Sequence, residues 1–117
     1  MRKTGLLHGR LLAVVAELGH TDTVVIADVG LPLPPGMERI DLALVPSVPG
    51  MLQTVRAVLA SRSPALRAKT LQVLEGLPVR SMPHSELEQL TASARAVVRT
   101  GETTPYANVE LVAGVTF

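Results

Sequence analysis

Residues 18–32 read LGHTDTVVIADVGLP, and this stretch decides the fold of the chain. Its centre, residues 23–27, is short, β-branched and apolar, which predicts a strand buried on both faces. Polar residues stand at both ends of this strand, with His20 before it and Asp28 after it. Ligands of parallel α/β sheets bind beyond the carboxyl ends of the strands, so Asp28 is a candidate binding residue.

Helical and strand patterns alternate along the rest of the chain. Apolar residues recur at helical spacing from Leu7 to Leu18, and Gly19 is expected to end that helix at the C′ position. The further expected elements, in chain order, are a strand at 40–45, a helix over about 50–60, a helix from Ser63 to Gly76, a strand at 78–82, a helix starting at the capping box Ser85–Glu88, and strands at 95–99 and 109–113. This order predicts a single, three-layer-like α/β domain over residues 1–117, with a mostly parallel sheet flanked by helices.

The composition predicts an oligomer. The 117 residues are the size of one ordinary domain, and 47% of them are hydrophobic. One tyrosine and one phenylalanine are the whole aromatic content, so the core is expected from Leu, Val, Ile and Ala. A domain this small cannot cover so much aliphatic surface by itself, and subunit association would cover the remainder.

Charge and cysteine content exclude several classes of function. The chain has eleven basic and ten acidic residues and no run of basic residues, which argues against a nucleic-acid partner. The absence of cysteine excludes disulfides, thiolate metal sites and a cysteine nucleophile, and it fits a cytoplasmic protein. The apolar runs are too short to span a membrane, and Glu17 interrupts the one run that could resemble a signal peptide.

The histidines are candidates for proton transfer. His20 follows the expected end of a helix, where the helix dipole favours the protonated imidazole. His84 precedes a helix start that disfavours the charged form, so it would act as a hydrogen-bond partner or base. Each also has a purely structural interpretation, His20 as a boundary histidine and His84 as a loop histidine. His8 is interpreted as solvated, and the spacing of the three histidines does not predict a metal site.

Asp28 and a C-terminal cluster are candidates for holding a polyol. Asp28 can accept hydrogen bonds from two hydroxyls, or it can simply shape the turn that follows it. Tyr106 and Asn108 come after Pro105, and strand alternation would point both side chains to the same side. A phenol next to an amide suits a sugar, whereas a core tyrosine and a turn asparagine are the alternative.

Six stretches of the chain resemble one family of sugar enzymes, the D-ribose pyranases and fucose mutarotases. These stretches are Leu18–Asp22, Ala27–Pro32, Ile40–Leu44, Ala96–Glu102, Thr104–Asn108 and Ala113–Phe117. They occur in the same order as in the family, and they resemble the ribose branch more than the fucose branch.

The resemblance implies a function and a set of site residues. The implied enzyme is an isomerase without a cofactor or metal that interconverts the pyranose and furanose forms of D-ribose by acid/base ring opening and closure. In this family pattern His20 matches the proton donor. The matching substrate-binding residues are Asp28, His84, Tyr106, Ala107 and Asn108. The alternatives are a mutarotase for L-fucose or another monosaccharide, and a non-catalytic sugar-binding subunit.

The resemblance also implies an assembly. Such proteins form ring-shaped homo-oligomers, often decamers, with active sites at subunit interfaces. This chain departs from the family between about Val58 and Met82, where roughly a dozen residues are missing by the usual lengths of a strand and its connection. That departure leaves the size of the oligomer open. Glu88 stands where some relatives have a lysine, and it is explained as the acid of a capping box.

Overall fold

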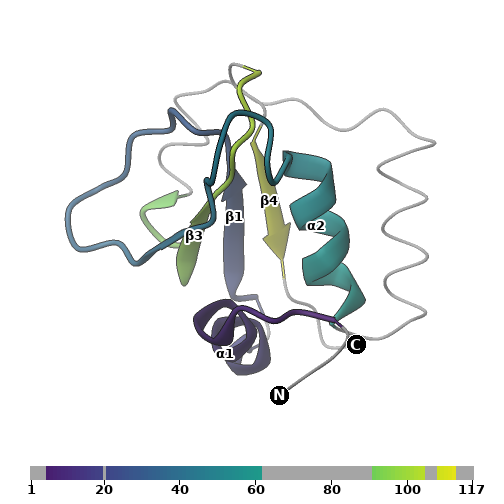
Figure 1. Ribbon diagram of the computed structural model, residues 1–117. Coiled ribbons are helices and arrows are strands. Elements are labelled where there is room, and N and C mark those ends of the chain that lie inside the picture. The colour runs from purple at the N-terminus through teal and green to yellow at the C-terminus, as the bar shows by residue number, and fades with distance from the viewer. Residues whose placement is uncertain (1–4, 20, 62–90, 105–107, 113–117) are drawn as a thin grey trace, which may run out of the picture.

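Figure 1 shows the computed structural model, which describes residues 5–19, 21–61, 91–104 and 108–112. Its elements are α1 (Gly9–Glu17), β1 (Thr23–Ala27), β2 (Arg39–Asp41), α2 (Met51–Ala60), β3 (Ala96–Arg99) and β4 (Val109–Val112). The elements expected within residues 63–90 lie outside the described residues.

The four strands form one sheet in the order β2-β3-β1-β4. β3 lies parallel to both β1 and β2, whereas β4 runs antiparallel to β1. The expected α/β class with a mostly parallel sheet is therefore confirmed. Because β1, β2 and β3 point the same way, their carboxyl ends share one edge of the sheet, and β4 begins at that edge.

β1 is a central strand of this sheet, and it has the bounds that its apolar run predicts. Val24, Val25 and Ile26 have no exposed surface. A strand that is paired along both edges and covered on both faces needs a continuous apolar run, because neither face can carry a polar side chain without a partner. The rest of the sheet is arranged around β1.

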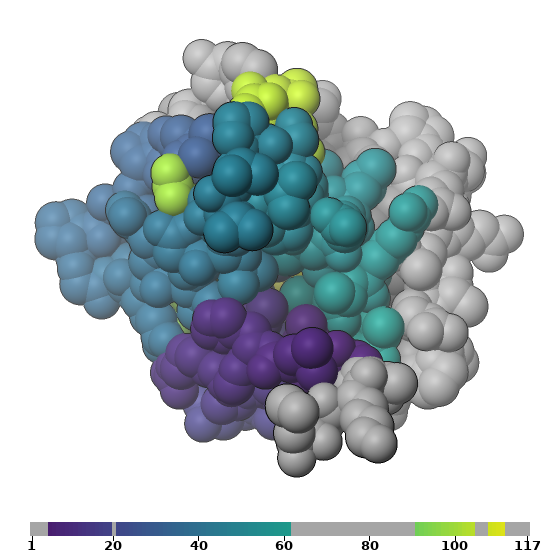
Figure 2. Space-filling view, viewed as in Figure 1, coloured from purple at the N-terminus to yellow at the C-terminus, as the bar shows by residue number. Residues whose placement is uncertain are grey.

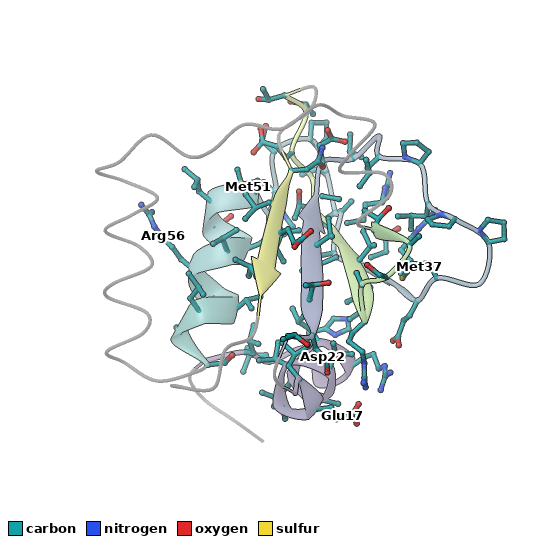
Figure 3. All side chains as sticks on the ribbon, turned by 180° about the vertical axis from the view of Figure 1, so that it is seen from behind. Glu17, Asp22, Met37, Met51 and Arg56 are labelled. Carbon is teal, nitrogen blue, oxygen red and sulfur yellow. The ribbon has the colours of Figure 1, made fainter. Side chains whose placement is uncertain are left out.

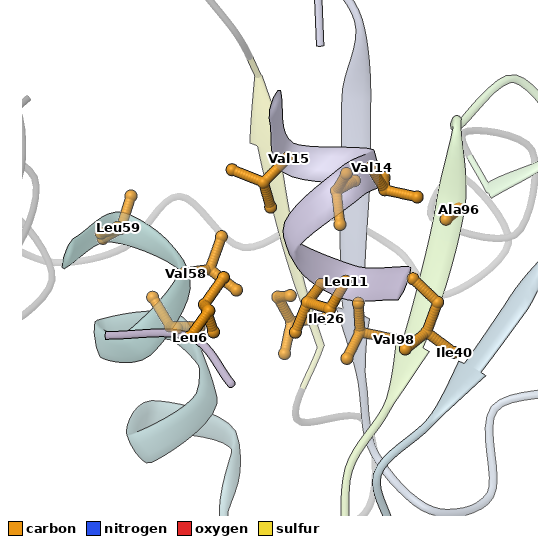
Figure 4. Packing of buried hydrophobic residues seen from close by; sticks show 12 residues of the cluster. Leu6, Leu11, Val14, Val15, Ile26, Ile40, Val58, Leu59, Ala96 and Val98 are labelled. Atoms are coloured by element: carbon orange, nitrogen blue, oxygen red, sulfur yellow. The ribbon is translucent and has the colours of Figure 1, made fainter. Parts of the chain in front are cut away.

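Both described helices pack on the same face of the sheet (Figure 4). Their buried side chains are Leu11, Val14, Val15, Val55, Val58 and Leu59. On the opposite face, Val25, Ala27 and Val97 pack against Leu31 from the loop after β1. The two faces alternate along each strand, as the two-residue period of a strand requires.

Helix α1 begins at a histidine that caps it. The exposed His8 is the N-cap residue, and its Nδ1 accepts a hydrogen bond from the Leu11 N–H at 3.2 Å. Gly19 occupies C′ as expected, but it does not have a positive φ. Instead the helix ends with Leu18 in an extended conformation, and Asp22 Oδ2 accepts from the Gly19 N–H at 2.8 Å.

The second strand is shorter than its apolar pattern predicts. β2 covers only Arg39–Asp41, so the expectation of a strand at 40–45 is wrong after Asp41. The Asp41 carboxylate accepts from the Ala43 N–H at 3.1 Å, which bends the chain locally. The Leu44 N–H then donates to Val48 O at 3.0 Å, so the chain turns back on itself instead of continuing along β3.

Candidate functional site at the carboxyl edge of the sheet

The carboxyl edge of the sheet brings together two of the predicted site residues. Asn108 Oδ1 accepts a hydrogen bond from the Asp28 N–H at 2.7 Å, and Asn108 Nδ2 donates to Asp28 Oδ2 at 3.4 Å. Asp28 is only 7% exposed. Asn108 reaches it because β4 starts beside the point where β1 ends.

Asp28 fulfils both of the roles that its sequence position suggests. Its Oδ1 accepts from the Gly30 N–H at 2.9 Å, so it does shape the turn after β1. A carboxylate has about four acceptor positions, and the described structure uses two of them. Asp28 therefore keeps capacity to accept hydrogen bonds from a bound hydroxyl.

A buried threonine joins the ends of β1 and β3. Thr100 is fully buried, and its hydroxyl donates to Ala27 O at 2.7 Å and accepts from the Glu102 N–H at 3.1 Å. The Val29 N–H donates in turn to Glu102 O at 2.9 Å. The backbone after β3 is thus fixed directly against the backbone that carries Asp28.

Gly101 allows a close backbone approach at this edge. A Cβ at this position would lie 2.6 Å from Val45 O and 2.7 Å from Val48 O. Figure 2 shows the segment around residues 45–50, in teal, next to residues 101–104, in yellow-green, at the top of the molecule. Only glycine leaves room for the turn of residues 45–48 to pack here.

The Glu102 carboxylate accepts hydrogen bonds from two separate segments. Its Oε1 accepts from the Met51 N–H at 3.1 Å, and its Oε2 accepts from the Thr104 N–H at 3.3 Å. The hydrogen bond from Met51, followed by those from Thr104, lowers the pKa of Glu102 below its ordinary value. Glu102 is therefore ionised at neutral pH.

An ion pair and a pocket lie next to Val29, the residue that follows Asp28. Arg99 Nη1 is 3.0 Å from both carboxylate oxygens of Asp41, and Arg99 Nε donates to Val29 O at 2.9 Å. A pocket of about 250 Å³ adjoins Arg99. Its lining residues are Val29, Ala43, Leu44, Val45, Pro46, Arg99, Gly101 and Thr103.

The described neighbours of the predicted proton donor lie at the other end of β1. His20 itself lies outside the described residues, but its neighbours Gly19 and Thr21 precede the amino end of the strand. Asp22, two residues after His20, lies there beside α1 (Figure 3). The five residues of β1 span roughly 16 Å at the rise of an extended chain, so this strand separates Asp28 from the segment around His20.

The remaining predicted site residues, His84, Tyr106 and Ala107, lie outside the described residues. Sequence reasoning also missed three residues at this edge, namely Arg99, Thr100 and Glu102. Arg99 ends β3, and Thr100 and Glu102 follow it as Asp28 follows β1, so the same edge rule could have singled them out. Their partners lie far away in the sequence, and this removes any local signal of what they bind.

The described residues offer neither a cluster of metal ligands nor a membrane-spanning helix. No group of three or more His, Asp or Glu side chains among them is arranged to hold a metal ion. No helix among them has the length and apolar character needed to cross a membrane.

Comparison with known proteins assigns the chain to a family. The model of the RbsD / FucU transport protein family matches residues 1–63 and 60–116. The chain belongs to this family. It is 48% identical to a D-ribose pyranase of Laribacter hongkongensis and 47% identical to one of Symbiobacterium thermophilum, in both cases over the whole of each chain.

Solved structures of the family share the fold. The structure of Bacillus subtilis RbsD complexed with D-ribose matches with a TM-score of 0.81 and 40% identity, over all of both chains. A fucose mutarotase from Streptococcus pneumoniae, solved with L-fucose, matches with a TM-score of 0.69 over 96% of this chain and all of that one. At 22% identity, the second match reflects the fold alone.

The comparison also locates a difference in length. The alignments to both D-ribose pyranases extend over 131 positions, whereas this chain has 117 residues. The family model matches in two segments that meet at residues 60–63. Both observations agree with a chain that is shortened after α2.

Proposed function

We propose that this protein is a D-ribose pyranase, an isomerase that interconverts the pyranose and furanose forms of D-ribose without a cofactor. The observation that carries the proposal is the Asp28–Asn108 pair, which stands at the ligand-binding edge of the sheet. Over its whole length, the chain is 40% identical to a protein whose structure was solved with D-ribose. A buried carboxylate next to an amide is suited to hold sugar hydroxyls.

The reaction needs only proton transfer. The sugar ring opens when its ring oxygen gains a proton and the anomeric hydroxyl loses one. The resulting aldehyde is then attacked by the C4 or the C5 hydroxyl, which closes the furanose or the pyranose. In this proposal His20 donates the proton, and Asp28, His84, Tyr106, Ala107 and Asn108 hold the sugar. General acid–base catalysis of this kind contributes about 10²–10⁴-fold.

We further propose that each site is shared between two subunits of a ring-shaped homo-oligomer, a decamer, in the cytoplasm. Support comes from β1, which separates the neighbours of His20 from Asp28 within one chain. Further support comes from apolar side chains exposed near the carboxyl edge, among them Leu44 at 77% and Val45 at 53%. Such side chains are better covered by a second subunit than by water.

The activity is tested by NMR magnetisation transfer between the pyranose and furanose signals of D-ribose. Wild-type protein should accelerate this exchange, and His20→Ala should abolish it while leaving the fold intact. His8→Ala is the matched control, because that imidazole caps α1 and has no role in the reaction. The same measurement with L-fucose tests the mutarotase alternative. Binding of ribose without accelerated exchange would contradict an enzyme.

The shared site is tested by mixing two inactive variants. His20→Ala and Asp28→Asn subunits, unfolded together and refolded, should form hybrid rings in which about a quarter of the sites are intact, by random pairing across interfaces. Each variant refolded alone is the control. Sedimentation of an active monomer at micromolar concentration, or hybrids without recovered activity, would contradict the shared site.

A further inference from the structure

Helix α2 supplies only part of its own N-terminal cap: Gln53 Oε1 accepts from the Gly50 N–H at 3.2 Å, but the Met51 N–H is bonded to a distant residue. Its N-cap residue is Gly50, which has no side chain to accept a hydrogen bond from the first turn. The Met51 N–H is bonded instead by Glu102 Oε1, from 51 residues further along the chain. A carboxylate at this end of a helix also interacts favourably with the helix dipole.

The same carboxylate holds the chain that leads to Asn108. Glu102 Oε2 accepts from the Thr104 N–H, four residues before Asn108. The Glu102 backbone is bonded on both sides, through its N–H to Thr100 and through its carbonyl to Val29. Glu102 is thus tied to α2, to the residue after Asp28 and to the segment before Asn108.

We propose that Glu102 is a positioning residue that sets the geometry of the Asp28–Asn108 pair. It does so by holding Thr104, four residues before Asn108, against the N-terminus of α2. Its effect on sugar affinity rests on the function proposed above, whereas its effect on the pair itself does not. Glu102 acts through these neighbours, because its two carboxylate oxygens accept from the Met51 N–H and the Thr104 N–H.

The test separates capping of α2 from positioning of the pair. Glu102→Ala removes both roles at once. Gly50→Asp restores a local cap, because Gly50 has a negative φ of −74° and a Cβ there would have no neighbour closer than 3.7 Å. In the double variant, Glu102→Ala with Gly50→Asp, α2 is capped again but Thr104 stays unbonded.

Melting temperature and affinity for D-ribose should respond differently in the double variant. The melting temperature should fall in Glu102→Ala and return toward the wild-type value in the double variant. Affinity for D-ribose, measured by calorimetry, should fall by about tenfold in both variants, the scale of one lost positioning hydrogen bond. Affinity that returns together with stability, or that never falls in Glu102→Ala, would overturn the positioning role.

A readout without sugar makes the test independent of the enzyme activity. The NMR signals of the Asp28 N–H and of the Asn108 side-chain amide report their mutual hydrogen bonds directly. Both should shift in Glu102→Ala and remain shifted in the double variant. Glu38→Gln is the control, because Glu38 is another carboxylate, paired with Arg10 away from this edge. If wild-type protein bound no ribose, the proposed function would fail, and these signals alone would decide the role of Glu102.

Discussion

The side-chain oxygen of Asn108 accepts a hydrogen bond from the backbone N–H of Asp28 at 2.7 Å, and 80 residues separate the two in the chain. This bond joins the end of the central strand to the start of the antiparallel one. It makes the position of each polar side chain depend on the other, so substitutions at Asn108 should alter more than a single sugar contact.

Asn108→Asp should make sugar binding depend on pH. The variant keeps an oxygen that can accept from the Asp28 N–H, but it places a second carboxyl beside Asp28. Because like charges resist ionising together, Asp28 raises the pKa of the introduced carboxyl. Affinity for D-ribose should fall at least about tenfold at pH 7 and less at pH 5. Calorimetry at the two pH values measures this.

Asn108→Ala is the matched control for that experiment. It removes the amide without adding a charge, so its loss of affinity should be similar at pH 5 and pH 7. If both variants showed the same pH dependence, the charge argument would be wrong.

Thr100→Val should destabilise the fold by about 1–3 kcal/mol, the usual cost of leaving buried polar groups without partners. Valine matches the shape of threonine, but it leaves the Glu102 N–H without its acceptor, whereas Ala27 O keeps the hydrogen bond from the Thr100 N–H at 3.0 Å. Urea unfolding measures the loss. Thr103→Val, at an exposed position, should change stability by less than about 0.5 kcal/mol. Equal losses of stability in Thr100→Val and Thr103→Val would contradict a stabilising role of the buried Thr100 hydroxyl.

Gly101→Ala should destabilise the protein by about 3 kcal/mol or prevent folding, because overpacking against backbone atoms cannot be relieved by a rotamer change. The atoms closest to the added methyl belong to the backbone of Val45 and Val48. Gly9→Ala is the control, since no atom lies within 4 Å of a Cβ there and alanine favours a helix. A Gly101→Ala protein with wild-type unfolding behaviour would contradict the close approach.

Protonation of Glu102 should contribute to the loss of stability at acid pH. Its pKa in the folded state is lowered, chiefly by the Met51 N–H, so its contribution is present above the ordinary carboxyl pKa of about 4.3 and is lost as the pH falls through the lowered value. Glu102→Gln should therefore flatten the fall in stability below about pH 4.3. Urea midpoints measured between pH 3 and pH 7 test this. Equal slopes for the two proteins would contradict it.

Asp41 should retain part of the acid sensitivity in the Glu102→Gln protein. Partial burial raises the pKa of Asp41, but the hydrogen bonds from Ala43 and Arg99 outweigh it, and the net pKa lies below the ordinary value. The remaining slope should decrease further when Asp41→Asn is added, while Glu38, whose pKa is lowered by its hydrogen bond with Arg10, should still contribute. If the double variant showed the same slope as Glu102→Gln alone, the contribution of Asp41 would be contradicted.

Local patterns in the sequence determined much of the fold. The apolar run of β1, the helical spacing of α1 and the β-branched residues of β3 are each sufficient to predict an element, because burial imposes a period that neighbouring residues must follow. Asp28 and Asn108 were predictable as candidates from their positions and from the chemistry of their side chains. One follows a strand and the other precedes one, and strand ends are where ligands bind.

The tertiary structure alone decided which of these residues meet. The Asp28–Asn108 bond, the capping of α2 by Glu102 and the contact of Gly101 with the turn at 45–48 all join segments that are far apart in the chain. Their strength depends on distances of a few tenths of an ångström, and only the packed sheet sets these. A sequence pattern indicates which residues of a segment are buried, but it does not indicate which distant donor will lie opposite a given acceptor.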